Sequence, residues 1–310
     1  MINIKIKIFC ALIFCGVSQT YADILIILPE SGPMARAGES VKQGIIKARF
    51  DSNSKIPIRF VDSSKTSLKN IFKKNVNKKI ELVIGPLALN EVEELMILKP
   101  KVPILALNQT NKNEANIYQF SLAKQQDANA LAKVMIKDKI KKLLVYREES
   151  SKKETEQFLM ALIAELPIKV EVLDQYPQKM KSKEGLLLLG HNNWLMQAVN
   201  FPKKNIYVQA LTVDESALPV GVKYCDIPAL YENVEKQKLK SYQDQETSSA
   251  YKRLIAFGHD SWKIAEFIMD KSKSHRIDFE GMTGHIVIEA NQITRTPECY
   301  EQLKNVLRRF

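Results

Sequence analysis

The sequence lacks the motifs that mark the common catalytic sites. It has no GxSxG nucleophile elbow, no HExxH zinc motif, no Walker phosphate loop and no GxGxxG dinucleotide loop. The acidic pair Glu148-Glu149 is most simply a solvated pair of charges, and no other carboxylate stands out as a catalytic acid. The histidines are scattered without metal-ligand spacing, at His191, His259, His275 and His285. We therefore expect no enzyme, no metal and no cofactor.

The chain also lacks an apolar run long enough to span a bilayer. Its N-terminal run, Ile8–Val17, has ten residues, follows Lys5 and Lys7, and precedes the small residue Ala22. This is the layout of a secretory signal peptide that is cleaved after Ala22. We expect residues 1–22 to be removed and residues 23–310 to act in the periplasm without a transmembrane span.

Cysteine is scarce, and its positions bear on the anchor and on cross-linking. Cys15 is the candidate for lipid attachment to the outer membrane, but Phe14 before it is larger than the small residue such a site needs. After cleavage only Cys225 and Cys299 remain, which in an oxidising compartment can form one disulfide. They are far apart in sequence, so whether they meet depends on the fold.

Positive charge is in excess, with a formal net charge of +11. A basic surface favours anionic partners. However, the cations are mostly lysines scattered along the chain without clustered arginine and aromatic residues, so we interpret them as a compositional bias. Export and this pattern argue against nucleic acid as a partner.

The stretch Asp23–Arg49 organises the rest of the chain. Ile24–Leu28 is apolar throughout, which is typical of a strand buried on both faces of a parallel sheet. A loop at Glu30–Pro33 and a segment with helical periodicity follow. The sequence therefore predicts the first βα unit of an α/β fold.

Strands and helices continue to alternate through the first two-thirds of the chain. Expected strands are 56–61, 81–84, 103–107, 117–122, 141–146, 170–173, 185–190 and 205–208, and expected helices are 66–77, 90–98, 127–135, 152–166 and 193–200. The last third breaks this rhythm. There we expect an extended segment at 220–228, a polar loop or exposed helix at 236–249, helices at 251–257 and 259–270, a turn at 281–284, a strand at 285–288 and a closing helix at 297–309.

Loops after the first, third and fourth strands should converge at one edge of a parallel sheet. They carry Ser31-Gly32, Gly85-Pro86 and Asn108-Gln109. Small and polar residues there can bind an anionic or zwitterionic group. The competing interpretation is turn and capping chemistry, which is equally plausible for Ser31 and better for Gly85-Pro86.

Several segments, in order, resemble the C-terminal, type I periplasmic-binding-protein-like domain of the LpoA/LppC family of penicillin-binding protein activators. Together they cover nearly all of residues 23–310: ILIILPESGPMARAGESVKQGI from Ile24, Val83–Leu87, Val102–Asn108, Tyr118–Leu122, Cys225–Pro228, Ala256–Trp262 and Gly281–Gly284. The resemblance implies two α/β lobes of parallel sheets with helices on both faces. Lobe 1 would comprise residues 23–120 and 226–288, and lobe 2 residues 121–225 and 289–310.

The resemblance also implies three hinge crossings, near Phe120-Ser121, Tyr224–Asp226 and Ile288–Ile293. Because the second and third would run side by side, they would bring Cys225 close to Cys299. Candidate cleft residues are Ser31, Gly32, Asn108, Gln109, Ser121 and Asp260, of which Ser31 and Asp260 match ligand-holding positions in amino-acid-binding relatives. Asp260 could instead cap the helix that follows it.

Two functions follow from this resemblance. The first is a non-catalytic periplasmic regulator that binds a class A penicillin-binding protein and stimulates peptidoglycan synthesis, with peptidoglycan or a small molecule as a further cleft ligand. The second is a solute receptor for an amino acid or similar molecule in ABC transport. The chain departs from larger family members because its binding-protein-like domain directly follows the signal peptide and because its lipid-attachment motif is poor.

Overall fold

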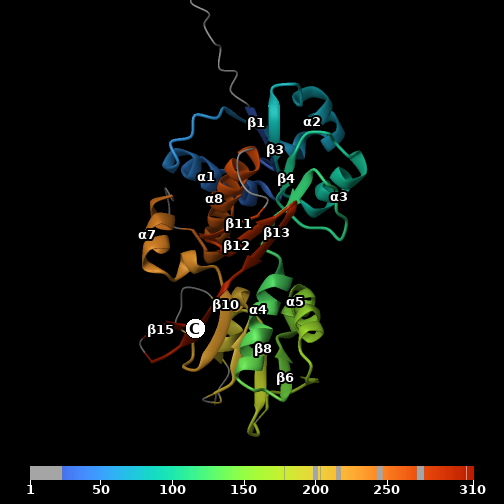
Figure 1. Ribbon diagram of the computed structural model, residues 1–310. Coiled ribbons are helices and arrows are strands. Elements are labelled where there is room, and N and C mark those ends of the chain that lie inside the picture. The colour runs from blue at the N-terminus through green and yellow to red at the C-terminus, as the bar shows by residue number, and fades with distance from the viewer. Residues whose placement is uncertain are drawn as a thin grey trace, which may run out of the picture.

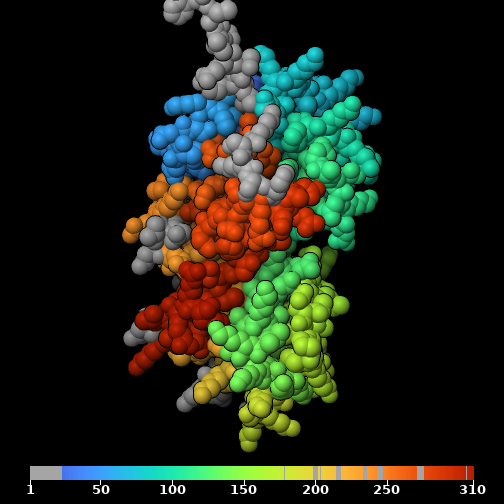
Figure 2. Space-filling model, in the orientation of Figure 1, coloured from blue at the N-terminus to red at the C-terminus, as the bar shows by residue number. Residues whose placement is uncertain are grey.

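The computed structural model describes residues 23–177, 179–197, 202, 204–213, 218–242, 247–270, 276–304 and 306–310. The expected signal peptide, with Cys15, lies outside these residues, as does His275. The described residues form two α/β lobes stacked one on the other (Figures 1 and 2). No helix among them is both long enough and apolar enough to cross a membrane.

Lobe 1 is built on an eight-stranded sheet in the order β11-β12-β13-β5-β4-β3-β1-β2. The strands from β13 to β2 are parallel, and β12 is antiparallel to both of its neighbours, β11 and β13. The strand bounds are β1 Asp23–Leu28, β2 Ile58–Asp62, β3 Ile80–Ile84, β4 Ile104–Ala106, β5 Ile117–Gln119, β11 Arg276–Gly281, β12 Gly284–Glu289 and β13 Gln292–Thr296.

Helices cover both faces of this sheet because β1 is apolar on both sides. Ile24 and Ile26 pack in one core with α1 and α8, whereas Leu25 and Ile27 pack in a second core with α2 and α3. Successive residues of a strand point to opposite faces, so an unbroken apolar run needs two covering layers. The helices of lobe 1 are α1 Ala35–Asp51, α2 Leu68–Asn75, α3 Leu89–Leu98, α7 Asn233–Ser241 and α8 Ser249–Met269, with short 3₁₀ turns η1 Ser63–Lys65 and η4 Pro228–Leu230.

Lobe 2 is built on a seven-stranded sheet in the order β15-β14-β10-β9-β8-β6-β7. Five strands are parallel, and β14 and β15 add an antiparallel edge. The strands are β6 Lys142–Arg147, β7 Lys169–Leu173, β8 Glu184–Leu189, β9 Ile206–Val208, β10 Val222–Asp226, β14 Glu298–Gln302 and β15 Leu307–Arg309. The helices are α4 Lys124–Lys137, α5 Lys152–Glu165 and α6 Asn192–Gln197, with 3₁₀ turns η2 Glu149–Ser151 and η3 Ala210–Thr212. The last residues of the helix expected at 193–200 lie outside the described residues.

Two expectations about the helices are wrong. The closing helix at 297–309 is instead the strand pair β14 and β15. Cys299 and Tyr300 are both buried, in cores on opposite faces of the sheet, so this strand shows no polar alternation. The helices expected at 251–257 and 259–270 form the single helix α8, because Gly258 does not interrupt it. A Cβ built on Gly258 would lie 2.1 Å from the carbonyl oxygen of Val41, so glycine permits α1 and α8 to approach closely.

Three segments of chain connect the lobes. They join β5 to α4, β10 to η4, and β13 to β14. The third lies at Thr296–Glu298, later than expected, because β13 extends the sheet of lobe 1 through Thr296. Lobe 1 therefore includes residues 289–296, which were expected in lobe 2. On the lobe 2 side of the second and third crossings, β10 and β14 pair antiparallel, and Cys225 lies opposite Cys299.

Candidate functional site

The loops after β1, β3 and β4 lie at the edge of lobe 1 that faces lobe 2. The chain leaves the C-terminal end of β5 to enter lobe 2, and β1, β3 and β4 run parallel to β5. This edge holds most of the residues that sequence indicated as cleft candidates.

Ser31 hydrogen-bonds to the chain itself. Its hydroxyl donates to Asp62 Oδ2 at 2.8 Å, and the backbone N–H groups of Glu30 and Ser64 each donate to Asp62 Oδ1 at 2.9 Å. Burial alone raises the pKa of Asp62, but these donors outweigh it and lower the pKa to about 2. Gly32 beside it has a φ of +73° and open space around its Cα. Ser31 thus fixes the β1 loop to the end of β2.

Asn108, Gln109 and Ser121 form a second group at this edge. The Asn108 side-chain amide donates to the carbonyl oxygen of Leu87 at 3.1 Å, which ties the β4 loop to the β3 loop. The Ser121 hydroxyl donates to Gln109 Oε1 at 3.3 Å. These side chains are therefore brought together, but the polar contacts that they make are to their own chain.

Asp260 is fully buried in the middle of α8. Its carboxylate accepts hydrogen bonds from the backbone N–H groups of Met282 and Thr283 at 2.9 and 2.7 Å and from the Thr283 hydroxyl at 2.7 Å. The interpretation of Asp260 as a helix cap is wrong, because α8 begins eleven residues earlier at Ser249. Asp260 instead holds the turn between β11 and β12 against α8.

The facing edge of lobe 2 carries a pair that sequence reasoning missed. Glu148, at the end of β6, accepts from the His191 backbone N–H at 2.7 Å and from the Ser150 hydroxyl at 2.9 Å, and it lies 2.8 Å from His191 Nδ1. Burial raises the pKa of Glu148, but these hydrogen bonds outweigh it and the pKa is lowered. Only Glu149 of the acidic pair is mostly solvated, with its side chain 85% exposed.

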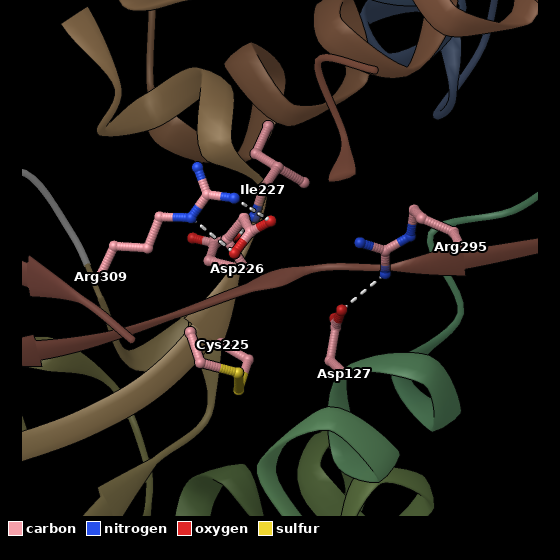
Figure 3. The surroundings of a disulfide bond; sticks show 8 residues. Asp127, Cys225, Asp226, Ile227, Arg295 and Arg309 are labelled. Carbon is pink, nitrogen blue, oxygen red and sulfur yellow. Dashed lines mark hydrogen bonds and ion pairs between the residues drawn. A yellow bond between two sulfur atoms is a disulfide. The ribbon is translucent and has the colours of Figure 1, made fainter. Parts of the chain in front are cut away.

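Two buried ion pairs, which we call the interlobe ion pairs, connect the lobes at the crossings. Arg295 on β13 contacts Asp127 on α4 at 2.6 Å, and Figure 3 shows its guanidinium pointing toward that carboxylate. Arg253 on α8 contacts Asp226 on β10 at 2.5 Å and also donates to the carbonyl oxygen of Ala210 at 3.0 Å. The Arg295 side chain is 1% exposed and that of Asp226 is 3% exposed.

A disulfide joins Cys225 and Cys299 beside these pairs (Figure 3). Their Cα atoms are 4.0 Å apart, and 74 residues separate them in sequence. The bond links β10, which precedes the second crossing, to β14, which follows the third. Two buried ion pairs and a disulfide therefore lie at or beside the crossings.

The polar side chains at the facing edges interact with groups of the chain itself. Among the described residues, no three of His, Cys, Asp and Glu are grouped so that they could hold a metal ion. The carboxylates with shifted pKa values, Asp62 and Glu148, accept hydrogen bonds from their own loops. The arrangement therefore fixes the loops of the two facing edges and the relation between the lobes.

The curated relatives found by sequence comparison are penicillin-binding protein activators. The family model "LppC putative lipoprotein" matches residues 12–154. The penicillin-binding protein activator LpoA of Haemophilus ducreyi is 22% identical over 85% of this chain, and the match covers 50% of that relative. The chain thus spans about half the length of the curated relatives it matches.

Solved structures show the same fold. The C-domain of Haemophilus influenzae LpoA, a regulator of PBP1A, superposes with a TM-score of 0.69 at 19% identity, covering 93% of this chain and 99% of that one. A putative branched-chain amino acid ABC transporter protein from Chromobacterium violaceum gives 0.72 at 20% identity, with 90% and 99% covered. The architecture is therefore that of a two-lobed, type I periplasmic-binding-protein-like domain, and the N-terminal half of the chain is similar to the LppC family.

Proposed function

We propose that this chain is a non-catalytic periplasmic regulator that binds a class A penicillin-binding protein and activates peptidoglycan synthesis. The observation that carries this proposal is the match to penicillin-binding protein activators along 85% of the chain. The match to the putative lipoprotein family supports an extracytoplasmic location. Cleavage after Ala22 and release into the periplasm are part of the proposal, since Phe14 makes Cys15 a poor site for a lipid anchor.

The polar contacts at the facing edges support a regulator over a receptor. A receptor that closes on a solute needs convergent polar groups that are available to the ligand. Here Ser31 and Asp260 hydrogen-bond within the chain, and the interlobe ion pairs span the crossings. We infer that binding to the synthase uses the outer surface of the lobes.

Retention of a synthase on the immobilised chain 23–310 tests this proposal. A class A penicillin-binding protein should be retained, whereas a class B enzyme from the same organism serves as the matched control and should not be. Equal retention of both enzymes, or of neither, would overturn the proposal.

The second candidate function is a solute receptor for ABC transport. It is favoured by the Chromobacterium violaceum protein, because the match covers 99% of that chain and so needs no missing domain. A receptor should be stabilised by its solute, by about 2.7 kcal/mol at a concentration 100-fold above Kd. A thermal-shift screen of amino acids and muropeptides tests this: a clear shift with one free amino acid would favour the receptor over the regulator.

A further inference from the structure

Positive charge is concentrated in one segment of lobe 1. Residues 55–79 contain eight basic residues and one acidic residue, Asp62, so this segment contributes +7 (8 − 1) of the formal net charge of +11. The expectation that the lysines are merely scattered is therefore wrong for this region. We call its basic residues the basic face: Lys55, Arg59, Lys65, Lys69, Lys73, Lys74, Lys78 and Lys79.

All eight side chains of the basic face are exposed, and they have almost no acidic partners. The Lys65 ammonium lies 3.6 Å from Asp62, and the Arg59 guanidinium donates to the backbone carbonyl of Asn75 at 2.8 Å. Asp62 is itself buried and already accepts several hydrogen bonds. Within the described part of the chain, the other six lysines form no ion pair with a carboxylate. Their charge is thus available to an outside partner.

The basic face is continuous because its elements are neighbours in the fold. Strand β2 is the edge strand of its sheet, and Arg59 links it to the C-terminal end of α2. Helix α2 buries Leu68, Ile71 and Phe72, which leaves its lysines outward. Figure 1 shows α2 beside β1 at the end of lobe 1 farthest from lobe 2, and Figure 2 shows the cyan residues of this region gathered there.

The chain enters the fold beside the part of the basic face that precedes β2 and β3. The Asp23 N–H donates to the carbonyl oxygen of Lys79 at 3.0 Å, and the Ile24 N–H donates to that of Pro57 at 2.9 Å. The N-terminus of the chain 23–310 therefore lies next to the backbone of Pro57 and Lys79.

We propose that the basic face is a docking surface for an anionic phospholipid bilayer. Seven of its eight cations are lysines, and no exposed aromatic residue lies among them. Protein interfaces are depleted in lysine and enriched in Tyr, Trp and Arg, which argues against a protein partner for this face. Lysine clusters without aromatic anchors are attracted to anionic headgroups through their field, without specific pockets.

Vesicle co-sedimentation of the chain 23–310, which contains every described element, tests this proposal. Vesicles of phosphatidylcholine containing phosphatidylglycerol should bind the protein, vesicles of phosphatidylcholine alone should not, and high salt should release it. Because each lysine near an anionic surface contributes about fivefold in partition coefficient, the variant Lys69→Glu/Lys73→Glu/Lys74→Glu/Lys78→Glu should bind at least about 100-fold more weakly.

A variant with the same change in net charge provides the control. Lys133→Glu/Lys153→Glu/Lys169→Glu/Lys181→Glu alters exposed lysines of lobe 2 and should keep most of the binding. Equal loss in the two variants would show that net charge alone drives the binding and would overturn the proposal. Absence of binding to anionic vesicles would also overturn it. So would loss of synthase retention in the first variant alone, because that result would assign the face to a protein partner. If inorganic phosphate at millimolar concentration displaced the vesicles, the face would be a site for a single phosphate group, and the proposal of a bilayer would be overturned.

Discussion

At the scale of single residues, two aspartates hold loops that a solute receptor would turn toward its ligand. Asp62 accepts from the β1 loop and from η1, and Asp260 accepts from the turn between β11 and β12. Both carboxylates thus receive three or more donors from their own chain. Such charge-assisted hydrogen bonds are about twice as strong as neutral ones.

Asp62→Asn should lower the free energy of unfolding near neutral pH, by about 1.5–3 kcal/mol, because it replaces charge-assisted acceptors with a neutral amide. The folded-state pKa of Asp62, about 2, is below its ordinary value of 3.8. Its contribution is therefore complete above about pH 4 and is lost as the pH falls toward 2. Denaturation at a series of pH values should show the difference between wild type and variant shrinking over that range.

The exposed residue Asp174 offers the matched control, and Asp174→Asn should leave stability nearly unchanged. If Asp62→Asn lowered the free energy of unfolding by the same amount from pH 7 to pH 2, this would contradict the account of Asp62.

Sequence reasoning located these residues but not their roles. For Ser31, turn chemistry and ligand binding were equally plausible. In the structure its hydroxyl donates to Asp62, which lies 31 positions further along the chain. Asp260 contacts residues 22 and 23 positions ahead in sequence. Such contacts depend on tertiary packing, which local patterns do not encode.

At the scale of elements, strands buried on both faces were predictable and the C-terminal strands were not. The apolar runs Ile24–Leu28 and Leu186–Leu189 belong to central parallel strands as expected. The segment after Pro297 matched the pattern of a helix that begins with proline, but β10 offers it an open edge and a cysteine partner. Tertiary pairing therefore decides its structure.

Gly258→Ala should destabilise the protein by about 1–3 kcal/mol, since the added Cβ would overlap the Val41 carbonyl and push α1 from α8. Guanidinium denaturation measures this change. The sign is diagnostic, because alanine in place of glycine within an unconstrained helix would stabilise by about 1 kcal/mol. A gain in stability would contradict the close packing of these helices.

At the scale of the whole molecule, the interlobe ion pairs hold together two lobes that are connected three times, and the disulfide ties β10 to β14 within lobe 2. The two-lobed plan was implied by the family resemblance, including the neighbouring second and third crossings. The ion pairs were not expected, because they join residues that lie far apart in sequence. The basic face was not expected, because the lysines were interpreted as a compositional bias and not counted segment by segment.

Arg295→Met should cost about 3–5 kcal/mol, because it leaves the Asp127 carboxylate largely buried without its partner. The double variant Arg295→Met/Asp127→Leu should recover part of that loss, and thermal or chemical denaturation measures both. The exposed pair Lys152–Glu149 is the control, where Lys152→Met should cost less than about 1 kcal/mol. Similar costs for Arg295→Met and Lys152→Met would contradict a structural role for the interlobe pair.

The measurement that tests the central claim most directly is the rate of glycan polymerisation by a purified class A penicillin-binding protein, with and without the chain 23–310. The account predicts a rate that rises with added chain and saturates, while the chain alone polymerises nothing. A rate that stays unchanged at concentrations of chain that saturate synthase binding would contradict it.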